Sequence, residues 1–307
     1  MTTPQIKRLR QVSTLIISTL LFSFSMHAQS ETPKANVGKK IHEGKSDISG
    51  SVDIKIGVNS VKNLIESGSG NTATTRIGGV SQSGVTGKLN INLEKLGDIT
   101  NTVKGDNNQS HIKIGTVENS KLGTESTITV QAKNITSEVL GGKDNIADMR
   151  IGTIENSNIK NKLEIDVNVN GNIKNSIGNG IGNKANMKIG SIDNSTLGDV
   201  KIKVLAKNIT NEILGNGNKN TAIMNIGTVS NSNGAGKVNI DVDLQGDVKN
   251  SISGGGTGNV AVMQIGAINN AKIEGNVDIK VVSKGVITNE IKGGDRNTSE
   301  ISMGFID

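Results

Sequence analysis

Side chains that could carry out catalysis are few in this chain, and their spacing does not bring them together. Beyond residue 30 the sequence has two histidines, His42 and His111, and the whole chain has no Cys, Trp or Tyr. A protein zinc site needs three or four His, Cys or carboxylate ligands, and a serine nucleophile needs a base such as histidine beside it. Asp and Glu are scattered without a repeated column. The sequence therefore predicts no catalytic, metal or cofactor-binding residues, and we expect that the protein is not an enzyme.

The charged residues also argue against nucleic acid as a partner. The chain has 34 Lys and Arg against 28 Asp and Glu, and the two signs are mixed along the sequence. Proteins that bind single-stranded nucleic acid combine a basic groove with aromatic side chains on which bases stack. Neither feature is present in this sequence, so we expect no nucleic-acid partner.

Asparagines do recur at a fixed spacing, and their amides both donate and accept hydrogen bonds. In stacked β layers such a column can bond amide to amide along the stack, as in amyloid ladders. We predict a structural ladder at Asn71, Asn108, Asn145, Asn183, Asn220, Asn259 and Asn297. A second column, with Ser137 in place of one asparagine, contains Asn63, Asn101, Asn175, Asn211, Asn250 and Asn289.

Both columns belong to a repeat of about 37 residues. Each unit has an Ile-Gly anchor, with Met303-Gly304 as the last form, and successive anchor glycines are 37, 37, 38, 37, 39 and 38 residues apart. The anchor glycines are Gly78, Gly115, Gly152, Gly190, Gly227, Gly266 and Gly304. A repeat of this length indicates stacked units that cover one another's apolar faces.

Spacing by two within each unit is the period of a β-strand. Small and apolar residues follow the first Asn column at this spacing, with Met at Met149, Met187, Met224 and Met263. We expect these Met side chains to point inward and the neighbouring Arg150 and Lys188 to point outward. Only Pro33 follows residue 28, which suits strands whose N–H groups all bond to the next layer.

The predicted fold is therefore all-β: a β-solenoid with amyloid-like stacking of layers. Each unit has two comparable strand halves, so we favour two turns of 18–19 residues per unit and about 14 turns in all. The alternative is one longer turn per unit.

The first residues have the pattern of a secretory signal peptide. Lys7, Arg8 and Arg10 precede an apolar run at residues 14–24, and small residues follow up to Ala28. That run is too short for a membrane-spanning helix. We predict a signal peptide at 1–28, a polar segment at 29–49 and a repeat domain at 50–307. The protein is expected to be secreted, extracellular or at the cell surface.

The repeats resemble subunits of bacterial functional amyloids. Residues 68–73 (GSGNTA) and 256–261 (GTGNVA) are similar to the Gly-x-Gly-Asn-x-Ala core of curlin repeats. The unit length, the Asn-Ser pairs such as Asn119-Ser120 and the segment 105–110 are more similar to Fap-type fibre proteins. The resemblance covers most of residues 50–307. It implies an extracellular fibre that scaffolds a biofilm and adhesion, whose subunits are secreted unfolded and assemble outside the cell.

We therefore expect a self-assembling subunit of an extracellular fibre or biofilm matrix. Its partners would be other copies of itself, with a dedicated outer-membrane export channel or nucleator as a further partner. The expected assembly edge is the last strand, with Ile301, Met303 and Phe305, because an uncovered strand offers free N–H and C=O groups to another copy. This chain lacks the Gln ladder of curlin repeats and the Cys pair that ends many Fap-type subunits. Its core is also richer in Ile, Val and Met than the core of either family. A monomeric or cell-surface β-solenoid adhesin thus remains an alternative, and an ice-binding protein is a third, weakened because Thr is only intermittent in its column.

Overall fold

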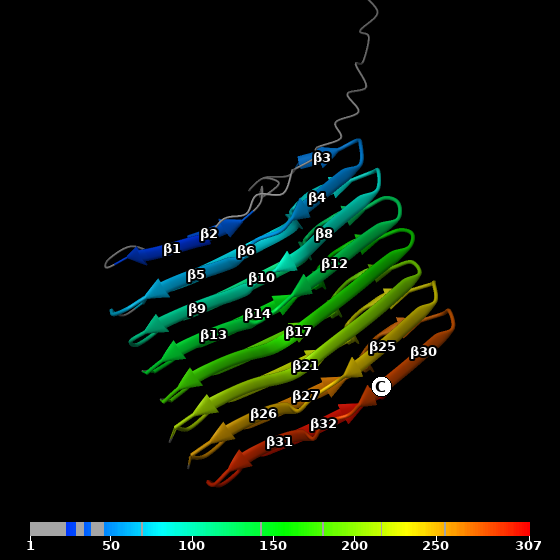
Figure 1. The fold of residues 1–307 in the computed structure, drawn as a ribbon. Coiled ribbons are helices and arrows are strands. Elements are labelled where there is room, and N and C mark those ends of the chain that lie inside the picture. Colours follow the sequence, from blue (N-terminus) through cyan, green and yellow to red (C-terminus); the bar gives the residue numbers. More distant parts are fainter. Residues whose placement is uncertain are drawn as a thin grey trace, which may run out of the picture.

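The computed structural model describes residues 46–307, except residues 69, 142, 180, 216 and 255, and the backbone of two earlier strands, β1 and β2. Most of this part is β-strand, it contains no helix, and all strand pairs are parallel. The strands lie one above another as successive layers, from the blue N-terminal end to the red C-terminal end (Figure 1). The predicted β-solenoid is confirmed.

Three parallel sheets run along the axis of the stack. The 13-stranded sheet contains β1 (Ser23–Ala28), β4 (Val52–Ile56), β5 (Ser60–Ile65), β8 (Leu89–Leu96), β9 (Asp98–Lys104), β12 (Ser126–Ala132), β13 (Ile135–Leu140), β17 (Leu163–Gly178), β21 (Val200–Leu214), β25 (Val238–Leu244), β26 (Val248–Ser253), β30 (Val277–Ser283) and β31 (Ile287–Lys292). The 12-stranded sheet contains β2 (Lys34–Val37), β6 (Thr72–Ser81), β10 (Gln109–Glu118), β14 (Ile146–Ile151), β15 (Ile154–Glu155), β18 (Lys184–Ile189), β19 (Ile192–Asp193), β22 (Thr221–Ile226), β23 (Val229–Ser230), β27 (Val260–Ile265), β28 (Ile268–Asn269) and β32 (Thr298–Met303). The 7-stranded sheet contains β3 (Ser46–Ile48), β7 (Ser83–Val85), β11 (Lys121–Leu122), β16 (Asn158–Ile159), β20 (Thr196–Leu197), β24 (Asn233–Gly234) and β29 (Lys272–Ile273).

Each repeat unit makes one turn of the solenoid. The register pairs equivalent residues of successive units, as in Met149 with Met187 and Ile165 with Ile202. The stack therefore has about seven turns with a spacing of about 37 residues. The preferred interpretation of two short turns per unit is wrong. The two strand halves of a unit do not stack on each other, because they belong to different sheets of one layer.

The core is made of side chains at alternate strand positions. Met149, Met187, Met224 and Met263 are all fully buried, whereas Arg150 and Lys188 are on the outer side. The predicted parity is therefore confirmed. A main apolar cluster fills the wide part of each layer, and a narrower cluster of Ile, Val and Ala lies beside the second Asn column.

The Ile-Gly anchor marks a sharp inward bend in the 12-stranded sheet. Gly190 has a φ of 55°, a left-handed conformation that costs little only for glycine. A Cβ atom on Gly190 would lie 2.5 Å from Cγ2 of Val204. The anchor is thus glycine for two reasons, backbone conformation and lack of space.

The segments predicted at the N-terminus lie partly outside the described residues. Of the predicted signal peptide at 1–28, only the backbone of β1 is described, and it pairs in parallel with β5. Within the predicted polar segment at 29–49, β2 pairs with β6 and β3 pairs with β7. Regular pairing therefore begins before residue 50.

Candidate functional site

A groove follows the glycine bend on the outer face of the 12-stranded sheet. In each layer, the outward side chain two residues before the anchor glycine faces one about three residues after it. Lys188 and Asp193 are such a pair on either side of Gly190, with Nζ and Oδ2 3.0 Å apart. Because the layers are in register, the same pair of positions recurs along the axis as a row of mostly polar side chains.

Over three successive layers, the groove is filled by charges of alternating sign. Within one layer Lys113 Nζ lies 2.6 Å from Glu118 Oε1, and between layers Lys188 Nζ lies 2.8 Å from Glu155 Oε1. The six side chains of this charge ladder are Lys113, Glu118, Arg150, Glu155, Lys188 and Asp193. They are half-buried or buried, so their attraction is screened less than that of exposed pairs.

Contacts within the charge ladder and beside it shift several pKa values. Burial by itself raises the pKa of Asp148, but a hydrogen bond from His111 and the charge of Arg150 outweigh it and hold that pKa below its usual value. Burial lowers the pKa of Lys188, but Glu155 and Asp193 outweigh it and raise the pKa above its usual value. These groups are therefore held in their charged forms as a structural network.

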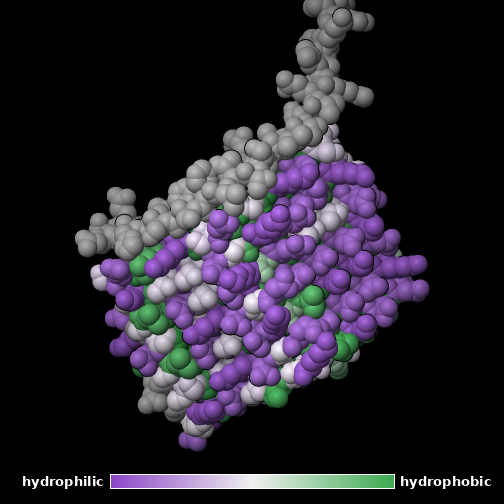
Figure 2. All heavy atoms as spheres, in the orientation of Figure 1, coloured by the Kyte–Doolittle hydropathy of each residue, from purple (hydrophilic) through white to green (hydrophobic). Residues whose placement is uncertain are grey.

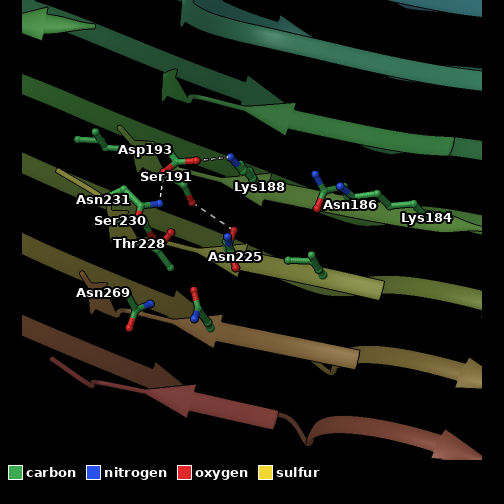
Figure 3. A pocket seen from close by; sticks show the side chains of 13 residues that line it. Lys184, Asn186, Lys188, Ser191, Asp193, Asn225, Thr228, Ser230, Asn231 and Asn269 are labelled. Carbon is green, nitrogen blue, oxygen red and sulfur yellow. Dashed lines mark hydrogen bonds and ion pairs between the residues drawn. The ribbon is translucent and has the colours of Figure 1, made fainter. Parts of the chain in front are cut away.

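Toward the C-terminal layers the ladder ends in a pocket lined mostly by uncharged polar side chains. This pocket has a volume of about 340 Å³. Figure 3 shows its wall, where Lys188 contacts Asp193 and Asp193 accepts a hydrogen bond from Asn231 at 3.0 Å. Here Asn225 and Gln264 take the positions that are equivalent to Lys188 in the next two layers. Two buried atoms of the pocket, Asn225 Oδ1 and Asn269 Nδ2, have no hydrogen-bond partner among the described residues. The pocket therefore offers amide groups and no aromatic surface.

The first Asn column lies just before the strands of the 12-stranded sheet that lead to the anchor glycines, and it is buried in the inner layers. Its bonds differ from the predicted amide-to-amide ladder. Each Oδ1 accepts a hydrogen bond from the backbone N–H of the previous Asn, as from Asn145 to Asn183 at 2.8 Å. The same contact joins Asn71, Asn108, Asn145, Asn183, Asn220, Asn259 and Asn297 in sequence. The side-chain Nδ2 instead turns back to the glycine-rich turn, as from Asn183 to Asn179 O at 3.3 Å.

The amide-to-amide ladder occurs in the second column. Asn175 Nδ2 donates to Asn211 Oδ1 at 2.8 Å, Asn211 to Asn250 at 2.8 Å, and Asn250 to Asn289 at 2.7 Å. Each Nδ2 also reaches backbone carbonyls of the facing 12-stranded sheet, such as Ala185 O from Asn211. This column therefore ties the two sheets together across the narrow part of the layer.

Replacing Asn183 by Ala is expected to destabilise the solenoid. The buried Asn145 N–H would lose its partner, which costs about 1–3 kcal/mol, and the exposed turn residue Asn179 would lose the hydrogen bond to its carbonyl. The matched control is Lys184→Ala on the exposed outward face of the adjacent strand β18, which we expect to change stability by about 0.5 kcal/mol or less. Urea denaturation followed by circular dichroism measures both. Equal midpoints for the two variants would contradict the structural role of the column.

The expected assembly edge is on the exposed face of the last layer. Ile301, Met303 and Phe305 have exposed fractions of 46%, 43% and 49%, although the equivalent residues of inner layers are buried. Phe305 lies beyond β32, and its carbonyl accepts a hydrogen bond from Ile268 N–H at 2.8 Å. The first two side chains lie in the inward row of β32, so they would become core if another layer were added.

A second exposed apolar group was not found from the sequence. Leu140, Ile181 and Leu214 are exposed to 41%, 44% and 40% at the glycine-rich turns. Figure 2 shows hydrophobic atoms gathered along the side where β13 and its neighbours end, beside an otherwise hydrophilic face. Sequence reasoning also missed the groove, although the recurring pair of charges five residues apart, as in Lys113 and Glu118, was a usable signal.

Comparisons with protein-family models, curated proteins and solved structures find no match to this chain. Within the described ranges, no helix is long and apolar enough to cross a membrane. Likewise, in this part of the chain no three His, Cys, Asp or Glu side chains gather as a set of metal ligands.

Proposed function

We propose that this protein is a self-assembling subunit of an extracellular fibre or matrix, in which copies add to one another as further layers of the solenoid. The observation that carries this proposal is the last layer. Its inward side chains are partly or largely exposed, whereas the same positions in inner layers are buried. A second copy is the partner whose side chains repeat the same columns.

The backbone of the last layer supports the same conclusion. Thr298 N–H and Gly304 N–H donate to Asn259 O and Ile265 O of the preceding layer. Peptide groups alternate direction along a strand, so Ile301 and Met303 direct their N–H groups away from β27. An edge of this kind pairs readily with another strand, and pairing would bury the apolar row at the same time.

The proposed route to this assembly follows the resemblance to functional-amyloid subunits. The signal peptide would direct export, and an outer-membrane channel or nucleator would act before assembly at the cell surface.

Ile301→Pro tests the edge in the chain that begins at residue 29. Proline removes the outward N–H of Ile301 and is tolerated where that N–H faces solvent, so the inner layers should keep their circular dichroism spectrum. We expect filament mass, measured by sedimentation and electron microscopy, to fall at least tenfold. Ile301→Val keeps the N–H and is the control. Undiminished filaments from Ile301→Pro would overturn the edge mechanism.

A cell-surface adhesin is the second candidate, and the groove favours it. Asn225 Oδ1 and Asn269 Nδ2 have no hydrogen-bond partner in the described part of the chain, and they lie in a polar pocket that is open to a hydroxyl-rich ligand such as a polysaccharide. A glycan array with monomeric protein tests this function. Binding that is lost in Asn225→Leu and retained in Asn90→Leu, a substitution on another sheet, would support the adhesin over the fibre subunit.

A further inference from the structure

The two ends of the solenoid complement each other in their backbone groups. Val248 N–H in β26 donates to Val286 O in the next layer. Peptide groups alternate in direction along a strand, so the N–H groups of Ile287, Asn289 and Ile291 in β31 face away from β26, and the groups between them face β26. At the N-terminal end of the stack, the side chains of Val61 and Asn63 in β5 point inward. Their N–H groups point along the stack toward β9. The edge of β5 remote from β9 is formed by the peptide groups of the intervening residues. The outward N–H donors of β31 therefore match the carbonyl acceptors on that edge of β5.

The Asn ladder carries the same complementarity in its side chains. The ladder runs from Nδ2 of one layer to Oδ1 of the next. The ladder bonds begin at Asn175 and the column itself begins at Asn63, and in both residues, which have no Asn before them in the preceding layer, the Oδ1 atom is buried without a hydrogen-bond partner among the described residues. At its last member Asn289 Nδ2 contacts Ser299 Oγ at 2.9 Å, in the absence of a following amide. Asn289 of one copy would thus donate to Asn63 of the next.

Charged groups at the two ends match as well. Nε of Arg76 in β6 is buried without a hydrogen-bond partner in the described part of the chain. Glu300 in β32 is exposed and stands in the column of Asp148, the residue whose Oδ2 lies 2.9 Å from Arg150 Nε. Adding β6 of a second copy to β32 would place Arg76 diagonally beside Glu300.

The strands ahead of β3 occupy these N-terminal edges. β1 pairs with β5 from Ser60 to Ile65, and β2 pairs with β6 from Thr74 to Ile77. In this register Met26 lies opposite Asn63. Figure 1 shows β1 and β2 on the outer side of β5 and β6. β1 lies within the predicted signal peptide, so cleavage after Ala28 would remove it.

We propose that copies join with β31 of one against β5 of the next, with Asn289 opposite Asn63, and that β1 and β2 are a cap that must leave before they join. This inference rests on the proposed function, because it states where and when the copies of the fibre meet. The occupant of the edge is a second copy of the same chain. Removal of the signal peptide then takes away β1 only after export has begun, and β2 is displaced from β6 when the next copy adds.

Cysteine cross-linking tests the register, because the chain has no cysteine of its own. Lys62 and Thr288 are outward residues that the proposed register places opposite each other, about 4.8 Å apart between adjacent strands. That distance lies within the range for a disulfide. In the chain 29–307 carrying K62C and T288C, we expect oxidised ladders of dimers and higher oligomers on non-reducing gels. The control S60C with T288C is displaced by two residues and is expected to give at least tenfold less product.

The cap is tested by comparing assembly of residues 1–307 with that of 29–307 at equal concentration. We expect the longer chain to have a lag at least tenfold longer. The double variant Ala35→Pro with Asn36→Pro, made in 29–307 to weaken β2, should shorten the lag further. Equal lags for 1–307 and 29–307 would refute the cap. Filaments that cross-link through Ser60 in place of Lys62 would refute the register and leave the fibre function standing. Absence of filaments from 29–307 under all conditions would refute the proposed function itself.

Discussion

Met187→Lys is expected to lower the free energy of unfolding by about 4 kcal/mol or more, because it places an unpaired charge in the core. Met187 is fully buried and lies in register between Met149 and Met224 of the neighbouring layers. No acidic side chain shares that inward row of the 12-stranded sheet. The midpoint of urea denaturation, followed by circular dichroism, measures the loss.

The control for this substitution has to be chosen from the structure. Lys188 faces outward but its Nζ lies 2.8 Å from Glu155 and 3.0 Å from Asp193, so replacing it would strand two carboxylates. Lys184 is on the same strand, on the same outward face, and exposed. Lys184→Met should change the midpoint little, since surface substitutions are usually within about 0.5 kcal/mol. Comparable losses from Met187→Lys and Lys184→Met would mean that the assigned faces of the strand are wrong.

Gly190→Ala is the second substitution with a large expected effect. A left-handed conformation costs an L-residue about 1–2 kcal/mol, and crowding of a packed core adds about 1–3 kcal/mol. The new Cβ would lie 2.5 Å from Val204 Cγ2 and 3.2 Å from Ile202 Cγ2. We therefore expect a loss of about 2–5 kcal/mol, measured as a lower midpoint of urea denaturation.

Gly178→Ala is the matched control for the bend. Gly178 is at the end of β17, its φ is not in the left-handed region, and the nearest atom to an added Cβ is 3.8 Å away. Alanine should be neutral there or should stabilise slightly, because it restricts the unfolded chain more than glycine does. If Gly190→Ala proves as mild as Gly178→Ala, the anchor glycine is not required by conformation or space.

The layered fold could be predicted because one column of residues repeats one environment seven times. Ile114, Ile151 and Ile189 precede the anchor glycines, and each is fully buried in the same row. The repeat length and the alternation by two therefore predicted parallel stacking and the inward face of each strand. The number of turns per unit could not be predicted this way, because two strand halves of similar pattern suit either stacked short turns or a single long turn.

That this chain stacks, and which side chains of each unit point inward, could be predicted from the repeat period and the strand period. The hydrogen bonds of each column depend on where the fold places it and could not. Asn183 accepts from the backbone of the preceding layer, whereas Asn211 joins an amide ladder, since the strand halves place one column at a turn and the other between two sheets. The groove also needed the structure, because the bend at Gly190 is what brings Lys188 to Asp193.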